Sequence, residues 1–136
     1  MRDDDEMASI LKSMKRIAVV GLSGRPDRPS HEVAAYLQQA GLEIIPVNPA
    51  ESGQILGQPV YRDLASVPGD LDVVDVFRRS DAVLALAKEA ARRGRIRAFW
   101  MQPGISSAPA RALLERQGIA VVEDRCLKVE HSLRRR

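Results

Sequence analysis

The stretch between residues 17 and 40 constrains the fold most, because it joins an apolar strand, a glycine-rich loop and a helix start. Ile17–Leu22 is predicted as a strand, and a loop of Gly, Ser, Arg and Pro follows it. A helix is predicted over Ser30–Ala40, with Ser30 as its N-cap and Gly41 as its end. Glycine lets the backbone approach a ligand closely, and the N-terminus of a helix attracts anions. This order of elements indicates a site that holds the phosphates of a nucleotide or a similar cofactor.

Strands and helices alternate along the rest of the chain. The remaining predicted elements are the strands 43–47, 71–77, 97–101 and 119–123 and the helices 80–93 and 108–117. Predicted strands such as Ile17–Val20 are apolar on both faces, which is typical of a parallel sheet covered on two sides. The pattern therefore predicts an α/β protein, with a Rossmann-like, doubly wound, mainly parallel five-stranded sheet and helices on both faces.

A single domain over residues 1–136 is expected, because this length suffices for one core and no linker or repeat interrupts the pattern. Within it, residues 1–14 should contain an N-terminal amphipathic helix, since their apolar residues recur at helical spacing. Residues 50–70 are expected to be irregular, apart from a short helical turn near 64–67. The arginine-rich residues 132–136 are expected to form a flexible tail.

Composition narrows the classes of function. The net charge of +3 is too small to indicate nucleic-acid binding by itself. The one cysteine, Cys126, excludes an internal disulfide framework and suits a reducing compartment. No apolar run approaches the roughly 20 residues of a membrane span, and the acidic N-terminus is unlike a signal peptide. We therefore expect a cytoplasmic protein with a small-molecule ligand, without membrane association and, as no Cys/His spacing fits one, without a metal site.

Ligands of open parallel sheets bind outside the carboxyl ends of the strands. That rule selects the loops 21–30, 48–53, 77–80, 102–107 and 124–128. These loops contain several cations, namely Arg25, Arg28, Arg78, Arg79, Arg125 and Lys128. They also contain Asp27, Glu51 and Asp124, so the edge is mixed but mainly positive. Such an edge suits a polyanionic ligand.

A nicotinamide dinucleotide is an alternative that the sequence supports less well. The loop after the first strand is not Gly-x-Gly-x-x-Gly, because Ser23 stands between Gly21 and Gly24 and no third glycine follows. Dinucleotide folds also place a carboxylate near the end of the second strand to bind the ribose hydroxyls. Here that strand ends in Asn48-Pro49, and Glu51 is a poor substitute. An NAD(P) site or another nucleotide site therefore remains the second interpretation.

Six motifs occur in one order along nearly the whole chain. They are Gly21-Leu22-Ser23, Arg28-Pro29-Ser30, Pro46-Val47-Asn48-Pro49, Val73-Val74-Asp75-Val76-Phe77-Arg78-Arg79, Trp100-Met101-Gln102-x-Gly104-Ile105 and Asp124-Arg125-Cys126-Leu127-Lys128. Together they resemble the small stand-alone CoA-binding domain proteins, which are similar to the N-terminal CoA-binding domain of the succinyl-CoA synthetase alpha subunit. The resemblance covers about residues 7–131.

The resemblance implies a Rossmann-like site for coenzyme A or an acyl-CoA. It assigns the phosphates to Gly21, Ser23, Arg25, Arg28 and Ser30, with Gly24 of the glycine-rich loop beside them. It assigns the adenosine and its 3′-phosphate to Asn48 and Pro49, and the flanks of the adenine and ribose to Val76, Phe77 and Arg78. It assigns the pantetheine path to Gln102, Gly104 and Ile105. Pro103 departs from the leucine that the resemblance leads us to expect.

The resemblance also implies a binding protein without catalysis of its own. The larger synthetase uses a phosphorylated histidine on a further domain, for which neither His31 nor His131 substitutes. A second hypothesis is a thiol-dependent enzyme that uses Cys126, with Arg125 and Lys128 lowering the pKa of the thiol. The other interpretation of Cys126 is a small buried apolar residue.

A third hypothesis is a nucleic-acid module that uses four arginines around Gly94, namely Arg92, Arg93, Arg95 and Arg97. These residues are expected at the amino edge of the sheet, and no aromatic residues interleave with them. A solvated charged surface is the plainer interpretation. Trp100 is expected in the core rather than as a stacking platform. A protein partner is not indicated by any motif.

Overall fold

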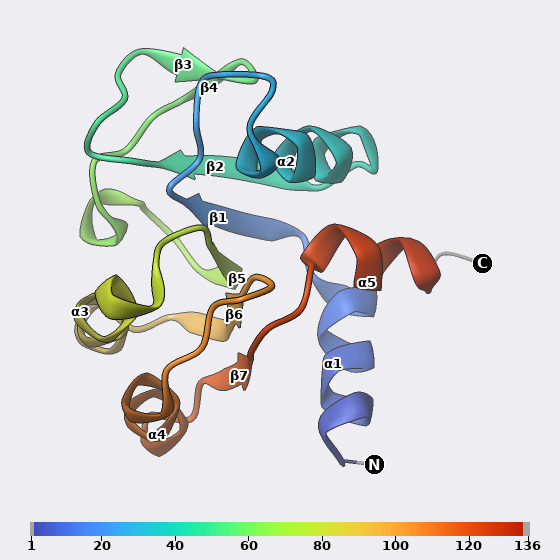
Figure 1. Ribbon diagram of the computed structural model, residues 1–136, viewed down its shortest axis with the longest axis vertical. Coiled ribbons are helices and arrows are strands. Elements are labelled where there is room, and N and C mark those ends of the chain that lie inside the picture. The colour runs from blue at the N-terminus through green and yellow to red at the C-terminus, as the bar shows by residue number, and fades with distance from the viewer. Residues whose placement is uncertain (1, 135–136) are drawn as a thin grey trace.

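Five parallel strands form the central sheet of the computed structural model, which describes residues 2–134 (Figure 1). The order across the sheet is β2-β1-β5-β6-β7, and all four neighbouring pairs are parallel. The strands are β1 (Arg16–Val20), β2 (Glu43–Val47), β5 (Leu71–Val76), β6 (Ile96–Met101) and β7 (Ala120–Val122). This arrangement confirms the predicted Rossmann-like, doubly wound α/β fold.

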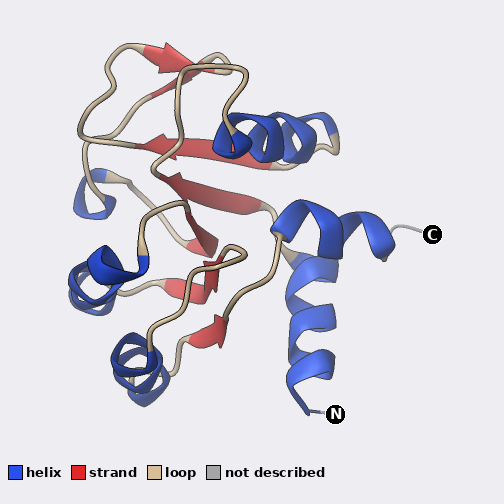
Figure 2. Cartoon of the chain, in the orientation of Figure 1, coloured by secondary structure: helices blue, strands red, loops and turns tan. Residues whose placement is uncertain are grey.

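Helices cover both faces of the sheet (Figure 2). The face with α1, α2 and α5 lies opposite the face with α3 and α4. The helices are α1 (Arg2–Ser13), α2 (Pro29–Gln39), α3 (Ser80–Arg93), α4 (Ala108–Arg116) and α5 (Leu127–Leu133), with a short 3-10 turn, η1 (Leu64–Ser66). Among the described residues, no helix has both the length and the apolar character needed to cross a bilayer.

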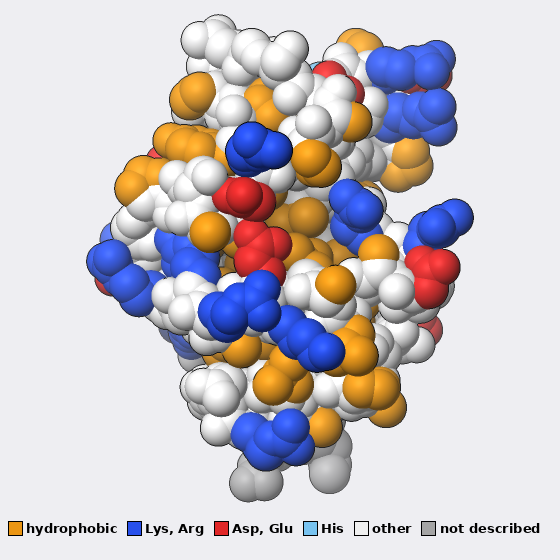
Figure 3. Space-filling view, turned by 90° about the vertical axis from the view of Figure 1, so that its left-hand side faces the viewer, with side chains coloured by type: hydrophobic (Ala, Val, Ile, Leu, Met, Phe, Trp, Pro, Cys, Tyr) orange, Lys and Arg blue, Asp and Glu red, His pale blue; other side chains and the backbone are white. Residues whose placement is uncertain are grey.

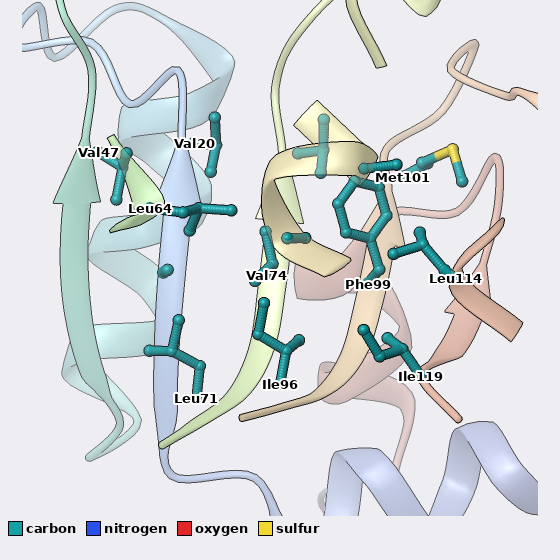
Figure 4. Packing of buried hydrophobic residues seen from close by; sticks show 14 of the residues in the cluster. Val20, Val47, Leu64, Leu71, Val74, Ile96, Phe99, Met101, Leu114 and Ile119 are labelled. Carbon is teal, nitrogen blue, oxygen red and sulfur yellow. The ribbon is translucent and has the colours of Figure 1, made fainter. Parts of the chain in front are cut away.

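Two hydrophobic cores lie on either side of the sheet, because successive strand residues point to opposite faces. On the α3/α4 side, Val74, Phe99 and Met101 pack with Leu114 of α4 and Leu64 of η1 (Figure 4). The other core contains the apolar residues of α1 and α2, together with Val19, Val73, Trp100 and Leu127. The indole nitrogen of the buried Trp100 donates to the carbonyl of Arg125 at 2.8 Å, which confirms the core interpretation.

A small antiparallel hairpin occupies part of the region that the sequence predicts as irregular. It consists of β3 (Gln54–Ile55) and β4 (Gln58–Pro59). After the hairpin, the N–H of Tyr61 donates to the carbonyl of Pro46 at 2.9 Å, and the N–H of Asn48 donates to Tyr61 at 2.8 Å. The segment therefore continues the hydrogen bonding at the outer edge of β2. The predicted helical turn near residue 64 is present as η1.

The chain ends differ from the prediction at the C-terminal side. The expected amphipathic helix in residues 1–14 is present as α1, and its apolar face is buried. The sequence predicts no helix after the last strand, yet α5 runs from Leu127 to Leu133. Residues 132 and 133 of the predicted tail therefore belong to a helix, which corrects that part of the prediction. Residues 135–136 lie outside the described residues.

The start of α2 also differs from the prediction. Arg28 is the N-cap and Pro29 is the first helical residue, so Ser30 does not cap the helix. The hydroxyl of Ser30 instead accepts the N–H of Ser23 at 3.0 Å. Pro29 has no N–H, and the N–H of His31 donates to Arg28 at 3.1 Å, so fewer helix N–H groups face the loop than the sequence suggests.

Candidate functional site

The strand order reverses between β1 and β5, and the loops that leave these two strands meet there. The N–H of Phe77 donates to the carbonyl of Val20 at 2.8 Å. Gly21 has φ +89°, and a Cβ at this position would lie 2.4 Å from the carbonyl oxygen of Phe77. Only glycine allows this approach, because any side chain would overlap the backbone of the neighbouring loop. This position is the topological switch point of the sheet, and in open α/β sheets ligands bind there.

The loop after β1 is held by contacts within the protein. The N–H of Gly21 donates to the carbonyl of Val47 at 2.8 Å, and the N–H of Ser23 donates to the Ser30 hydroxyl. The N–H of Arg25 donates to the Ser23 hydroxyl at 3.1 Å. These acceptors are neutral, and they fix the loop in one conformation. The loop is therefore shaped before any ligand arrives.

The loop after β2 packs against the loop after β1 through Asn48 and Glu51. The amide of Asn48 donates to the carbonyl of Leu22 at 3.0 Å, and its side-chain oxygen accepts the N–H of Ala50 at 2.9 Å. The carboxylate of Glu51 accepts the N–H of Gly24 at 3.0 Å. The sequence places Glu51 in this loop but does not indicate that it reaches the glycine-rich loop.

Three hollows surround these loops at the carboxyl edge. The first, the loop hollow, has about 380 Å³ and is lined by loop residues including Gly21, Arg28 and Asn48. The second, the apolar groove, has about 570 Å³ and is lined by residues including Phe77, Gln102 and Ile105. Phe77 lines both of these hollows, so they adjoin.

The third, the α3-side hollow, has about 430 Å³ and lies between η1 and α3. Its lining includes the apolar side chains of Val20, Val47 and Leu86. Its charged lining residues are Arg62, Arg78, Asp63 and Glu89. Arg78 also lines the apolar groove, so this arginine stands between the two hollows. No sequence motif assigns Arg62 to the site.

Cations predominate around this edge, as the sequence predicts. Figure 3 views the molecule from the left-hand side of Figure 1, the side towards which the arrowheads of β1 and β2 point. Basic side chains surround a hollow there that contains acidic and hydrophobic side chains. Ion pairs partly neutralise four cations, namely Arg25 with Asp27 at 3.7 Å, Arg79 with Asp81 at 3.5 Å, Arg125 with Glu130 at 3.4 Å and Lys128 with Glu32 at 3.5 Å. Within the described part of the chain, no carboxylate forms an ion pair with Arg28 or Arg78. These two guanidinium groups are available to an anionic ligand.

A buried carboxyl lies beneath the apolar groove. Asp75 of β5 is fully buried, and the amide of Gln102 donates to one of its oxygens. The other oxygen, Oδ2, has no hydrogen-bond partner in the described structure. Burial raises the pKa of Asp75 from 3.8 to about 8, and the hydrogen bond from Gln102 opposes part of that rise. Asp75 is therefore mainly protonated at neutral pH, and it fixes the amide of a groove-lining residue.

The loops after β6 and β7 are joined at the end of the apolar groove. The N–H of Gly104 donates to Asp124 Oδ1 at 2.6 Å, and the N–H of Ile105 donates to the carbonyl of Gln102 at 2.9 Å. Asp124 adopts a φ of +58°, which is uncommon for a residue other than glycine. Such local strain is frequent where a loop is shaped for a ligand.

Most residues that the sequence assigns to the site line these hollows. Those at the loop hollow are Gly21, Ser23, Arg25, Arg28, Ser30, Asn48 and Phe77; Pro49 lines the α3-side hollow, and Arg78, Gln102 and Ile105 line the apolar groove. Gly24 and Gly104 line none of the three, although both lie in the surrounding loops. Val76 is fully buried in the α3/α4-side core and does not reach the surface. Its assignment as a ligand contact is therefore corrected.

Cys126 lines the apolar groove and is half-buried, so it is not the fully buried residue that the plainer interpretation expects. The two cations proposed to activate it have carboxylate partners. Arg125 lies 3.4 Å from Glu130, and Lys128 pairs with Glu32. Among the described residues, no cluster of His, Cys, Asp and Glu could hold a metal ion.

Three arginines of the amino edge make contacts within the protein. Arg93 donates to the carbonyls of Leu64, Val67 and Gly69 at 2.9, 2.7 and 2.6 Å. Two further arginines are also engaged, Arg95 with Asp70 at 2.6 Å and Arg97 with the hydroxyls of Ser9 and Ser13. These contacts give Arg93, Arg95 and Arg97 a structural role.

Comparison with known proteins gives matches over nearly the whole chain. The profile of the CoA binding domain family matches residues 15–132. The uncharacterized protein YneT of Bacillus subtilis (strain 168) is 43% identical over 128 residues, which cover 94% of this chain and 93% of YneT. The structure of a Thermus thermophilus protein described as cell-free ID.343 is 36% identical, with a TM-score of 0.90 and 98% of both chains covered.

A more distant match lies within a larger enzyme. Acetyl-coenzyme A synthetase 1 of Ca. Korarchaeum cryptofilum, solved in complex with phosphate and ADP, is 22% identical to this chain with a TM-score of 0.67. The match covers 79% of this chain and 25% of that enzyme. At this identity the likeness concerns the fold alone.

Proposed function

This chain belongs to the CoA-binding domain family, and from that premise we propose that it binds coenzyme A or an acyl-CoA at the carboxyl edge of its sheet. The resemblance predicted from the six motifs is confirmed by the family match. The ligand, its contacts and the absence of catalysis are the proposal. A cytoplasmic location belongs to the same proposal, on the composition alone.

The observation that carries the proposal is that two arginines near the topological switch point, Arg28 and Arg78, have no carboxylate partner among the described residues. Arg28 lines the loop hollow, and Arg78 lies between the apolar groove and the α3-side hollow. Coenzyme A carries a diphosphate and a 3′-phosphate, and guanidinium groups bind phosphate through paired hydrogen bonds. Two separate cations beside two hollows suit a ligand with two separate phosphate groups.

The hollows also match the remaining parts of coenzyme A in polarity. The α3-side hollow has apolar walls against which an adenine ring can pack, and Pro49 lies at its side. The apolar groove, with Phe77, Ile105 and Val129, suits the pantetheine arm or an attached acyl group. Gln102 offers an amide at the wall of the same groove.

We further propose that the bound ligand is held rather than transformed. Arg125 and Lys128, the cations proposed to activate Cys126, pair with carboxylates, which weakens the case for an activated thiolate. Asp75 is buried below the groove surface, so it is placed to orient Gln102 rather than to touch a ligand. The thiol-dependent alternative is tested by alkylating Cys126 with and without coenzyme A, because an active thiolate would react rapidly and be protected by the ligand.

Calorimetric titration tests the proposal. Coenzyme A, 3′-dephospho-coenzyme A, NAD and ATP are each titrated at one ionic strength. We expect coenzyme A to bind best, and the loss on removing the 3′-phosphate to measure how far that phosphate is bound. If NAD or ATP binds while coenzyme A does not, the ligand assignment is wrong and the nucleotide alternative replaces it.

Arginine variants then locate the site. We expect Arg28→Ala or Arg78→Ala to weaken coenzyme A binding about tenfold or more, because each removes a charge-assisted contact to phosphate. Arg116→Ala is the matched control, since Arg116 is an exposed arginine in the last turn of α4. Equal affinity in all three variants would show that the ligand binds elsewhere.

A further inference from the structure

Glu51 places a negative charge on the loop that the proposed function assigns to phosphate. Its Oε2 accepts the N–H of Gly24 at 3.0 Å. A Cβ built on Gly24 would lie 3.1 Å from Oε1, so both carboxylate oxygens lie against this glycine. The backbone of Glu51 is fixed from the other side, where its N–H donates to the carbonyl of Asn48 at 3.3 Å. Glu51 lines the loop hollow, whereas Gly24, whose N–H the carboxylate covers, does not.

This carboxylate differs from the other acceptors of the loop. The N–H groups of Gly21, Ser23 and Arg25 donate to a carbonyl or to hydroxyls, all of them neutral. Those acceptors belong to the sheet, to α2 and to the loop itself. Glu51 is the charged acceptor, and it is held only by a short loop after β2. It is therefore the contact that an incoming anion can replace most readily.

Arg25 and Arg28 are the cations that line the same hollow. Arg25 already has a carboxylate, Asp27, at 3.7 Å. A phosphate that enters the hollow is attracted by the positive charge of Arg28 and repelled by the negative charge of Glu51. One N–H of Gly24 cannot serve both anions, so either the phosphate stays away or the carboxylate moves.

We infer that Glu51 occupies the place of a ligand phosphate on the Gly24 N–H and is displaced when the phosphate binds. This inference rests on the proposed function and adds a specificity-determining residue to it. Glu51 lowers the affinity of the hollow for every anion, and only a ligand with further contacts at the apolar groove or the α3-side hollow can displace it. Free inorganic phosphates are thereby discriminated against.

A different role for Glu51 predicts the opposite outcome. In dinucleotide-binding folds, an acidic residue after the second strand accepts hydrogen bonds from the ribose hydroxyls of the ligand. If Glu51 did so here, its removal would weaken the binding of every ribose-containing ligand. The sign of the change in affinity therefore separates the two roles.

The experiment compares wild type with Glu51→Ala and Glu51→Gln. Glutamine keeps an oxygen that can accept the Gly24 N–H but removes the charge, so it separates repulsion from simple occupation. We expect coenzyme A to bind about threefold to tenfold more tightly to Glu51→Ala, with a smaller gain for Glu51→Gln. Pantetheine, which has no phosphate, should bind all three proteins alike. Glu115→Gln on α4 is the control for net charge, and thermal unfolding checks that each variant folds.

Pyrophosphate provides a second probe that does not depend on coenzyme A. It should bind wild type weakly and Glu51→Ala more tightly, because it lacks the contacts needed to displace the carboxylate. If coenzyme A fails to bind while pyrophosphate shows this difference, the proposed function is wrong and the inference about Glu51 stands. If coenzyme A binds wild type and both variants equally, or binds the variants less well, the inference is overturned and the proposed function remains.

Discussion

Gly21 shows how a single residue fixes the position of the site. Its positive φ and its closeness to the Phe77 carbonyl are two separate constraints. Alanine at this position would adopt an unfavourable backbone conformation that costs about 1 kcal/mol. Its Cβ would also overlap the Phe77 carbonyl, and the pairing of β1 with β5 leaves little room to relieve this overlap. We therefore expect Gly21→Ala to lower the free energy of unfolding by about 3 kcal/mol or more in urea denaturation.

A matched glycine separates these two constraints. Gly41 has φ +95°, and a Cβ there would meet nothing within 4 Å. Gly41→Ala should therefore lose only the conformational part, about 1 kcal/mol. Equal decreases in the free energy of unfolding for the two variants would show that the contact with Phe77 contributes nothing. The loops after β1 and β5 could then separate without cost.

Asp75 gives the protein a pH dependence that can be worked out in sign. Its pKa is raised to about 8 in the folded protein, against 3.8 for an ordinary aspartate. Between these values the unfolded chain has released this proton while the folded chain retains it. The contribution of Asp75 to the free energy of unfolding is therefore fully present below about pH 4. It decreases as the pH rises towards 8, by at most about 1.4 kcal/mol per pH unit.

Asp75→Asn removes this titration while keeping an acceptor for Gln102. We expect the stability of wild type relative to Asp75→Asn to fall as the pH is raised from about 5 to about 8. Urea denaturation of both proteins at four pH values in that range measures the difference. A constant difference between them would mean that Asp75 is already ionised in the folded protein.

At the scale of elements, the long periodic segments could be predicted and the short ones could not. The strand Glu43–Val47 and the helix Ser80–Arg93 have the predicted bounds, because Asn48-Pro49 closes the strand and Gly94 ends the helix. The hairpin of β3 and β4 was missed because two-residue strands carry no periodicity. The first turn of α2 was misassigned because Ser30 has the side chain of an N-cap but bonds to Ser23 instead.

The site was predictable to a similar degree. The rule that ligands bind at the carboxyl edge located its loops, and the motifs selected residues such as Arg28 and Gln102 that line the hollows. Contacts across the fold were not predictable, because they depend on loop conformation. The hydrogen bond from Gly24 to Glu51 and the burial of Asp75 below Gln102 are of this kind.

Helix α5 is the helix that the sequence does not predict, and its docking can be tested. Leu127 is fully buried in the core that contains Trp100, whereas Leu133 on the same helix is 60% exposed. Leu127→Ala should lower the free energy of unfolding by about 2–5 kcal/mol through lost burial and a cavity. Leu133→Ala should change it by less than about 0.5 kcal/mol. Similar losses for the two variants would show that α5 does not dock as described.

For the molecule as a whole, the two edges of the sheet have different roles. At the amino edge, Arg93 and Arg95 bind carbonyls and a carboxylate of the chain itself, so charge there stabilises the fold. At the carboxyl edge, Arg28 and Arg78 have no such partners in the described structure, and the hollows lie beside them. The separation follows from the parallel sheet, because the carboxyl ends of all its strands lie at one edge and their amino ends at the other.

Hydrogen exchange with and without coenzyme A tests this separation. We expect slower exchange in the loops 21–30, 48–53, 77–80 and 102–107 when the ligand is bound, and no change in the loops at the opposite edge. Amides of the core strands exchange through global unfolding, and a ligand at about 100 times its Kd slows all of them by stabilising the fold by about 2.7 kcal/mol. Short labelling times must therefore be compared, because local opening dominates there. Protection centred on residues 92–97 would place the ligand at the amino edge. Neither the loops at the topological switch point between β1 and β5 nor Glu51 could then determine its binding.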